Sequence, residues 1–260
     1  MTLHTERHGS GRPILMVHGI GGSVRSFDPI VPRLSELREV ILFDLPGHGR
    51  SPALSGPQTV AAFADRIEAY IDSEGLEGVD LVGSSFGARL VLELSRRGVG
   101  RHCVSLDPGG FWQGWETRYF GTTLAASIRL VRWLQPVMPF IARHAATRSL
   151  LLAQLSARPW ALSPDLVLTE MRSFASTKVF DAVARELATG PLQMGAANTP
   201  GRLAIGWGRQ DRLLLPRQAY RAQAAFPSAK LHWFDGCGHF PQWDQPAQTV
   251  QLIEATTAGN

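Results

Sequence analysis

The sequence predicts an α/β fold in which a mostly parallel sheet is flanked by helices and carries an inserted helical cap. Short apolar runs of strand length recur along the chain, and helical patterns separate several of them. Strands that alternate with helices favour a parallel sheet, because each helix crosses over the sheet before the next strand begins. The alternation stops once for about ninety residues, an interval far longer than an ordinary connection.

Six apolar runs are expected to form buried strands, since each is short and rich in β-branched or large apolar side chains. Between several of them lie helical patterns, for example at residues 60–74 and 88–97, so the order is strand, helix, strand, helix. A further strand before the first of these runs is either missing or reduced to residues 3–7. The six expected strands are residues 14–17, 40–43, 79–82, 103–106, 203–207 and 231–234.

The long interval at residues 111–200 is expected to be the cap, which leaves residues 1–110 and 201–260 for the core. Prolines divide this interval into pieces that suit several short helices. Ser163 and Pro164 predict one helix start, because serine caps a helix and proline fits its first position.

The composition describes a soluble globular protein of 260 residues, with 44% hydrophobic and 18% charged residues. No secretory signal and no apolar run of membrane-spanning length are found, so we expect a cytoplasmic protein with no membrane partner. The net charge is +4, but the arginines are scattered, which argues against a nucleic-acid partner. Cys103 and Cys237 lack metal-type spacing and are expected to be buried free thiols.

The most informative segment is Gly-Ser-Ser-Phe-Gly at residues 83–87, which fits Gly-x-Ser-x-Gly. It follows an expected strand and precedes an expected helix, as a sharp turn that exposes a serine hydroxyl requires. Ser85 is therefore the candidate nucleophile. A serine hydroxyl is a weak nucleophile without a neighbouring base, so the motif needs partners elsewhere in the chain.

The candidate base is His239. It follows the last expected strand in a segment whose glycines, at 236 and 238, permit a tight loop into a site. The candidate acid is Asp211, which follows the strand at 203–207 and gives the chain order nucleophile, acid, histidine. Asp107 also follows a strand and stays open as an alternative acid.

A tetrahedral intermediate needs preorganised N–H donors for its negative oxygen. The glycine-rich loop at residues 18–22 follows the first of the six strands, and we expect the N–H groups of Ile20 and Phe86 to form this oxyanion hole. The loop lacks the lysine of a phosphate-binding loop and the spacing of a dinucleotide site. Neither a cofactor nor a metal is expected.

These segments together resemble the α/β-hydrolase superfamily, and the resemblance covers essentially the whole chain. It rests on His18-Gly19, the stretch Asp-Leu-Pro-Gly-His-Gly-Arg-Ser at 44–51, the serine motif, Asp211 and Gly238-His239. The resemblance implies the sheet topology, the nucleophile elbow and a Ser-His-Asp triad. The segment around His239 is similar both to serine esterases and to carbon-carbon bond hydrolases of ring-fission products.

The expected activity is cleavage of a carboxylic ester, thioester or lactone of a small, largely apolar substrate through an acyl-enzyme. Three alternatives stay open: carbon-carbon bond hydrolysis, cofactor-free perhydrolysis, and ligand binding with little turnover. The sequence does not specify the natural substrate or the oligomeric state. The residues expected to line the substrate pocket are Phe111, Trp112, Trp115, Phe240 and Trp243.

Overall fold

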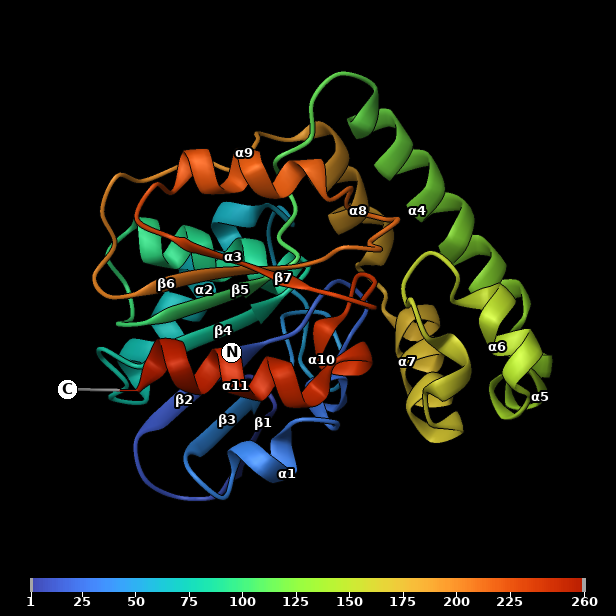
Figure 1. Ribbon diagram of the computed structural model, residues 1–260, viewed down its shortest axis with the longest axis horizontal. Coiled ribbons are helices and arrows are strands. Elements are labelled where there is room, and N and C mark those ends of the chain that lie inside the picture. Colours follow the sequence, from blue (N-terminus) through green and yellow to red (C-terminus); the bar gives the residue numbers. More distant parts are fainter. Residues whose placement is uncertain (1, 259–260) are drawn as a thin grey trace.

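The computed structural model describes residues 2–258, which form a seven-stranded sheet with helices on both faces (Figure 1). The strand order is β1-β3-β2-β4-β5-β6-β7, in which β1 pairs antiparallel with β3 and all other pairs are parallel. The predicted α/β class with a mostly parallel sheet is confirmed. The strands are β1 (Thr5–His8), β2 (Pro13–Val17), β3 (Glu39–Phe43), β4 (Asp80–Ser84), β5 (Cys103–Leu106), β6 (Leu203–Gly208) and β7 (Lys230–Phe234).

Helices connect the strands and fill the long interval between β5 and β6. Those of the core are η1 (Val24–Phe27), α1 (Val31–Leu34), α2 (Val60–Ser73), α3 (Phe86–Arg96), α9 (Arg217–Ala225), α10 (Pro241–Asp244) and α11 (Pro246–Thr257). Those of the interval are α4 (Trp115–Trp133), η2 (Gln135–Val137), α5 (Met138–Arg143), α6 (Ala145–Leu151), η3 (Pro159–Ala161), α7 (Pro164–Ser176) and α8 (Phe180–Thr189).

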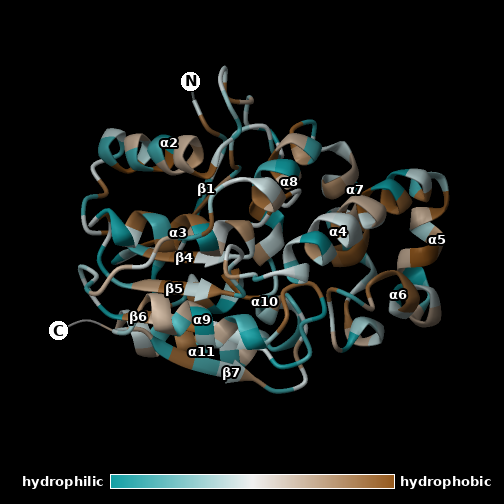
Figure 2. Ribbon diagram, turned by 90° about the horizontal axis from the view of Figure 1, so that it is seen from above, coloured by the Kyte–Doolittle hydropathy of each residue, from teal (hydrophilic) through white to brown (hydrophobic). Residues whose placement is uncertain are grey.

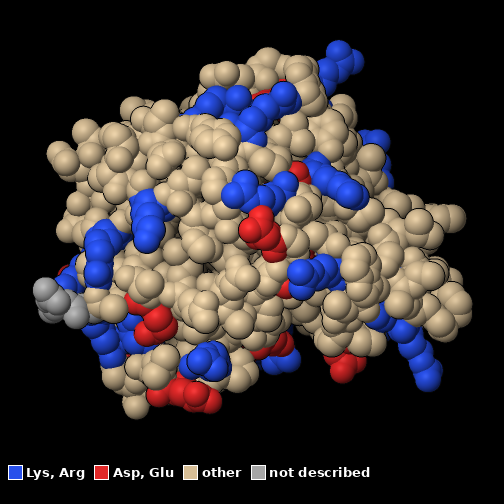
Figure 3. Space-filling model, in the orientation of Figure 1, with Lys and Arg blue, Asp and Glu red and all other residues tan. Residues whose placement is uncertain are grey.

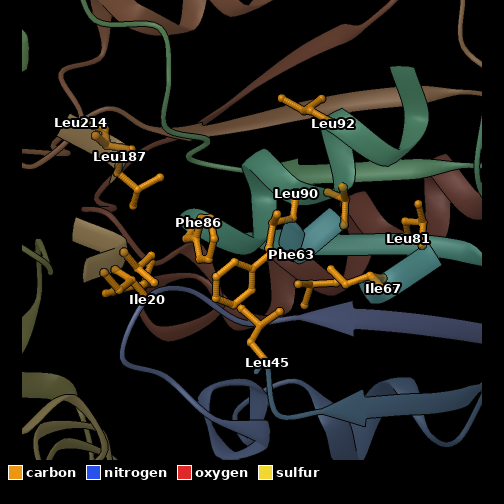
Figure 4. Packing of buried hydrophobic residues seen from close by; sticks show 14 of the residues in the cluster. Ile20, Leu45, Phe63, Ile67, Leu81, Phe86, Leu90, Leu92, Leu187 and Leu214 are labelled. Atoms are coloured by element: carbon orange, nitrogen blue, oxygen red, sulfur yellow. The ribbon is translucent and has the colours of Figure 1, made fainter. Parts of the chain in front are cut away.

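The sheet is buried on both faces, which is why its central strands are continuously apolar. In β2, Leu15 and Val17 belong to the larger core cluster with residues of α2 and α3, whereas Ile14 and Met16 belong to a second cluster with α1 and α11. Figure 4 shows the packing on the first face, where residues of α2 and α3 interdigitate above the strands. These two helical layers hold the strand ends in fixed positions.

The helices α4 to α8 lie beyond the carboxyl ends of the strands and pack on one another (Figure 1). The expected helix start at Ser163 is present, since its side chain accepts a hydrogen bond from the N–H of Leu166 at 3.1 Å. Figure 2 shows hydrophobic and hydrophilic segments alternating along these helices, as expected for helices that bury one side.

Lys and Arg are spread over the face shown in Figure 3 and form no continuous stripe there. Cys103 and Cys237 are both buried and unpaired. Within residues 2–258, no helix combines the length and the apolar character needed to cross a bilayer.

Candidate active site

Ser85 lies in the turn between β4 and α3, with a φ of 57° that side chains other than glycine rarely adopt. Two backbone hydrogen bonds fix this conformation. The N–H of Ser85 donates to the carbonyl of Leu106 at 2.9 Å, and the N–H of Arg89 donates to the carbonyl of Ser85 at 3.1 Å. Backbone strain that the surroundings enforce in this way is concentrated at functional sites.

The glycines on either side of Ser85 are required by close backbone contacts. A Cβ atom on Gly83 would lie 2.2 Å from the carbonyl oxygen of Gly87. A Cβ atom on Gly87 would lie 2.0 Å from the carbonyl oxygen of Val17. The turn can therefore be this tight only with glycine at both positions.

The structure brings Ser85, His239 and Asp211 into one hydrogen-bonded chain. His239 Nε2 lies 2.8 Å from Ser85 Oγ, and its Nδ1 lies 2.8 Å from Asp211 Oδ2. All three residues are buried, and Ser85 is the most accessible at 8%. Because the carboxylate accepts the Nδ1 proton, Nε2 is left unprotonated and can accept the proton of the serine hydroxyl.

Asp211 is held by its own backbone surroundings. Its Oδ1 accepts hydrogen bonds from the N–H groups of Leu213 at 2.8 Å and Leu214 at 3.0 Å, while its Oδ2 faces His239. These three hydrogen bonds fix the plane of the carboxylate. The arrangement orients the imidazole from one side only.

Asp107 lies beside this chain but does not contact the histidine. Its Oδ1 accepts the N–H of Gly208 at 2.9 Å, and complete burial together with the negative charge of Asp211 raises the pKa of its carboxyl well above the usual value. Donor atoms of Asp107, Asp211 and His239 all lie within 4.8 Å of one another, a spacing that a metal could use. Both nitrogens of His239 are already hydrogen bonded, so these donors fit a proton relay better than a metal.

The loop after β2 borders the serine. Gly19 approaches so closely that a Cβ atom there would lie 3.1 Å from that of Ser85. His18 fixes the loop, because its Nε2 accepts the N–H of Leu45 at 3.0 Å and its Nδ1 then donates to the carbonyl of Gly19 at 2.8 Å. Burial lowers the pKa of His18 to about 4, so this neutral tautomer persists at pH 7.

Ile20 lines the same cavity as Ser85, and Phe86 directly follows Ser85 in the chain. Phe86 is the first residue of α3, where an N–H has no acceptor inside its own helix. Its ring packs edge-on against Phe63 at 5.1 Å between ring centres (Figure 4). Among residues 2–258, no hydrogen-bond acceptor is found for the N–H of Ile20 or of Phe86.

An apolar cavity extends from the serine into the helices of the interval. Of the five residues expected to line it, Phe240 does so together with Ser85, His239 and Ile20. The rest of the lining comes mainly from aliphatic side chains on α4, α6 and α7 and the loop after α6. These side chains are Leu124, Ile128, Leu130, Val131, Leu151, Leu152, Leu155 and Met171.

The other four residues predicted for the pocket do not line this cavity. Phe111 is buried outside the cavity, and Trp112 is buried and stacks on Phe120 at 4.7 Å between ring centres. Trp115 is 59% exposed and lies under the guanidinium of Arg217. Trp243 is buried and donates through its indole N–H to the carbonyl of Ser26 at 3.2 Å.

Sequence reasoning missed Asp244, which joins the histidine loop to the segment after α6. Its Oδ2 accepts the N–H groups of Gly238 at 2.7 Å and Ala157 at 2.8 Å, and its Oδ1 accepts the hydroxyl of Ser156. The N–H of His239 also donates to the carbonyl of Leu155 at 2.8 Å. No local motif marks the contacts with the segment after α6, because Ser156 and Ala157 lie 88 and 87 residues before Asp244.

Comparison with known proteins identifies the class that this fold and site define. The model of the alpha/beta hydrolase family matches residues 14–252, so the chain belongs to this family. A 2-hydroxymuconate semialdehyde hydrolase of Pseudomonas putida is 29% identical over 270 residues, which cover 95% of this chain and 87% of the relative.

Two solved structures share the fold. An esterase of Thermogutta terrifontis is 21% identical with a TM-score of 0.75, and the match covers 97% of this chain and 92% of the esterase. A meta-cleavage product hydrolase of Pseudomonas fluorescens is 18% identical with a TM-score of 0.76, and the match covers 99% and 95% of the two chains. The fold is therefore shared by enzymes that differ in the bond they cleave.

Proposed function

We propose that the protein is a serine hydrolase that cleaves a carboxylic ester, thioester or lactone of a small, largely apolar substrate. The observation that carries this proposal is the Ser85-His239-Asp211 hydrogen-bonded chain at the inner end of an apolar cavity. A nucleophile, a base and an orienting carboxylate in hydrogen-bond contact are the parts that acyl transfer requires.

In the first step, His239 Nε2 takes the Ser85 proton while Oγ attacks the substrate carbonyl carbon. His239 then gives this proton to the leaving oxygen or sulfur, and the acyl group stays on Ser85. In the second step, water attacks the acyl carbon and His239 takes its proton, which it returns to Ser85 as the acid departs. Asp211 stabilises the imidazolium that forms in each step.

The negative oxygen of each tetrahedral intermediate would accept hydrogen bonds from the N–H groups of Ile20 and Phe86. Both donors belong to rigid backbone, one in the loop that His18 fixes and the other at the start of α3. Donors held in place before the reaction stabilise developing charge without reorganisation, and losing one such donor typically slows turnover by roughly 10²–10³-fold.

The cavity lining favours an uncharged acyl group over the dienoates that carbon-carbon bond hydrolases cleave. A ring-fission product carries a carboxylate, and burying a carboxylate without a cationic partner is costly. The residues that line the cavity include no lysine and no arginine. An aliphatic acyl chain instead matches the leucine-rich wall.

The proposal is tested with activated esters of increasing acyl length, each assayed with the wild-type protein and two variants. Ser85→Ala should lower kcat/KM by about 10⁴-fold or more, because no other group can accept the acyl chain. Ser127→Ala, which changes a second serine of the same cavity, should leave the esterase reaction within about threefold of wild type. Undiminished turnover by Ser85→Ala, or a dienoate cleaved faster than every ester, would overturn the assignment.

A further inference from the structure

The end of the cap region farthest from the sheet carries large apolar side chains that nothing in the fold covers. We call this surface the cap tip and define it by Trp133, Val137, Phe140 and Leu150. Their exposed fractions are 76%, 50%, 60% and 81%. They belong to the end of α4, η2, α5 and α6, and Figure 1 shows α5 and α6 as the outermost helices. Contiguous exposed apolar side chains of this size mark interaction sites.

The chain segment that carries the cap tip has charged residues of one sign, although its Arg132 pairs with Asp181 on α8 at 2.8 Å. From Thr117 to Pro164 the sequence contains six arginines and no Asp or Glu. Arg129 and Arg143 are exposed, and neither forms an ion pair with any of residues 2–258. In Figure 3 the outermost part of the cap region, on the right, shows blue side chains and no red one. The expected partner is therefore anionic as well as apolar.

The cap tip continues into the apolar cavity. Leu130 lines the cavity and is itself 46% exposed, one helical turn before Trp133. Leu151 also lines the cavity and directly follows the exposed Leu150. Apolar surface thus runs from outside the molecule towards Ser85.

We propose that the cap tip docks on the surface of a bilayer that contains anionic phospholipid. Aromatic and leucine side chains of a surface helix enter the boundary between headgroups and acyl chains, while arginines pair with the lipid phosphates. A second copy of this chain fits less well, because a twofold interface would bring Arg129 and Arg143 against their own copies. The expectation of no membrane partner rested on spanning segments and does not bear on docking from one side.

Binding is measured by co-sedimentation of the Ser85→Ala protein with vesicles, so that no turnover alters the lipid. We expect partitioning onto vesicles of equal parts phosphatidylcholine and phosphatidylglycerol to exceed that onto phosphatidylcholine alone by about tenfold. Added salt should reduce the difference, since the attraction to the lipid phosphates is screened. Equal partitioning onto the two vesicles, or none onto either, would overturn the proposal.

Two sets of variants separate the apolar from the charged contribution. Trp133→Ser with Phe140→Ser should lower partitioning by about tenfold, because binding scales with the apolar area that is buried. Tyr220→Ser is the matched control, since Tyr220 on α9 is also 60% exposed but lies in the core domain. Arg129→Gln with Arg143→Gln keeps the apolar surface and should remove the preference for anionic vesicles. This second double variant tests the proposal even where the double serine variant fails to fold.

Sedimentation velocity of the same proteins tests the alternative that a second copy of this chain covers the cap tip. A dimer that the Trp133 and Phe140 changes dissociate would assign the cap tip to self-association and overturn membrane docking. One consequence rests on the proposed function and is measured with Ser85 intact: the Trp133→Ser, Phe140→Ser protein should hydrolyse an ester embedded in the bilayer more slowly than wild type, and a water-soluble ester at the wild-type rate. Vesicle binding by a protein that hydrolyses no ester would leave docking intact and reject only the proposed function.

Discussion

Two aspartates follow neighbouring strands at the active site, and their hydrogen bonds assign them different roles. Asp211 contacts His239 at 2.8 Å, whereas Asp107 accepts the N–H of Gly208 and has no contact with the imidazole. Burial and the negative charge of Asp211 raise the pKa of the Asp107 carboxyl well above its usual value, which favours the protonated form. Because Asp107 does not contact the imidazole, Asp211 is the carboxylate placed to stabilise the imidazolium that forms during acyl transfer.

We therefore expect opposite outcomes from the same conservative change at the two positions. Asp211→Asn should lower kcat by about 10⁴-fold, because an amide favours the wrong histidine tautomer. Asp107→Asn keeps a side chain of the same shape at a position that does not contact the imidazole, and should retain kcat/KM within about threefold. Initial rates with one activated ester decide the matter, and a large loss at Asp107 with a small one at Asp211 would exchange their roles.

The sequence is sufficient to predict residues that a local turn and the chain order define. Ser85 lies in a five-residue motif whose glycines are sterically required, and Asp211 and His239 each follow a buried strand. Cavity-lining residues follow no such rule. Trp115 was expected in the pocket as an aromatic side chain of the cap, but which side of a helix faces a cavity depends on how separate helices pack. Leucines of α4 occupy that place instead.

At the scale of elements, Glu170 makes one of several buried contacts between the helices of the β5–β6 interval and the rest of the fold. Glu170 on α7 is 1% exposed and accepts the hydroxyl of Ser26 on η1, with distances of 3.1 and 3.0 Å to its two carboxylate oxygens. Burial is the main cause that raises the pKa of Glu170 to about 8, and the nearby charges of Asp28 and Arg25 partly oppose each other. The carboxyl is therefore mostly neutral below pH 8 in the folded protein.

This contact predicts a stability that falls with pH. Between the ordinary pKa near 4.5 and about 8, the folded protein holds a proton at Glu170 that the unfolded chain has lost, so each rise in pH favours unfolding. Glu170→Gln removes the titration while keeping a neutral partner for Ser26. The Tm of Glu170→Gln should rise relative to that of the wild type between pH 5 and pH 8.5. Over this range the difference between the two free energies of unfolding should change by a few kcal/mol.

The control for this titration is Asp165→Asn, which changes an exposed carboxylate on the same helix. Its Tm should follow that of the wild type across the range. A Tm difference between Glu170→Gln and wild type that stays constant with pH would show that Glu170 does not titrate in the folded protein.

The sequence predicted elements best where one segment alone determines them. The six expected strands were recognised because their apolar runs are continuous, and β5 has the expected bounds. Five of them are largely buried, whereas β7 lies at the edge of the sheet and buries only Phe234, so its predicted burial is wrong. The leading strand β1 reads Thr-Glu-Arg-His and is half exposed, so only pairing with β3 identifies it. The lengths of α4 and α5 depend on how the helices between β5 and β6 pack on one another, which no local sequence pattern predicts.

At the scale of the whole molecule, one carboxylate joins the amino ends of several strands, at the end of the sheet opposite the active site. Asp80, at the start of β4, is fully buried and contacts Arg12, which precedes β2, and Arg38, which precedes β3, the latter at 2.6 Å. It also accepts the N–H of His102 before β5, at 3.2 Å. Arg38 extends the connection to Thr257 at the end of α11 at 2.7 Å. This cluster stabilises the fold at a distance from Ser85.

Asp80→Ala should therefore reduce stability without changing the chemistry at Ser85. Removing Asp80 leaves the buried Arg38 with only the more distant Glu254, at 3.9 Å, as a counter-charge, and loss of one partner of a buried ion pair typically costs about 3–5 kcal/mol. The urea midpoint should fall accordingly, while kcat of the folded protein at low temperature stays within about twofold of wild type, because the site lies at the other ends of the strands. Asp72→Ala, at an exposed position of α2, is the control and should shift the midpoint little. If both variants unfold at the same urea concentration, the cluster at Asp80 does not hold the sheet together.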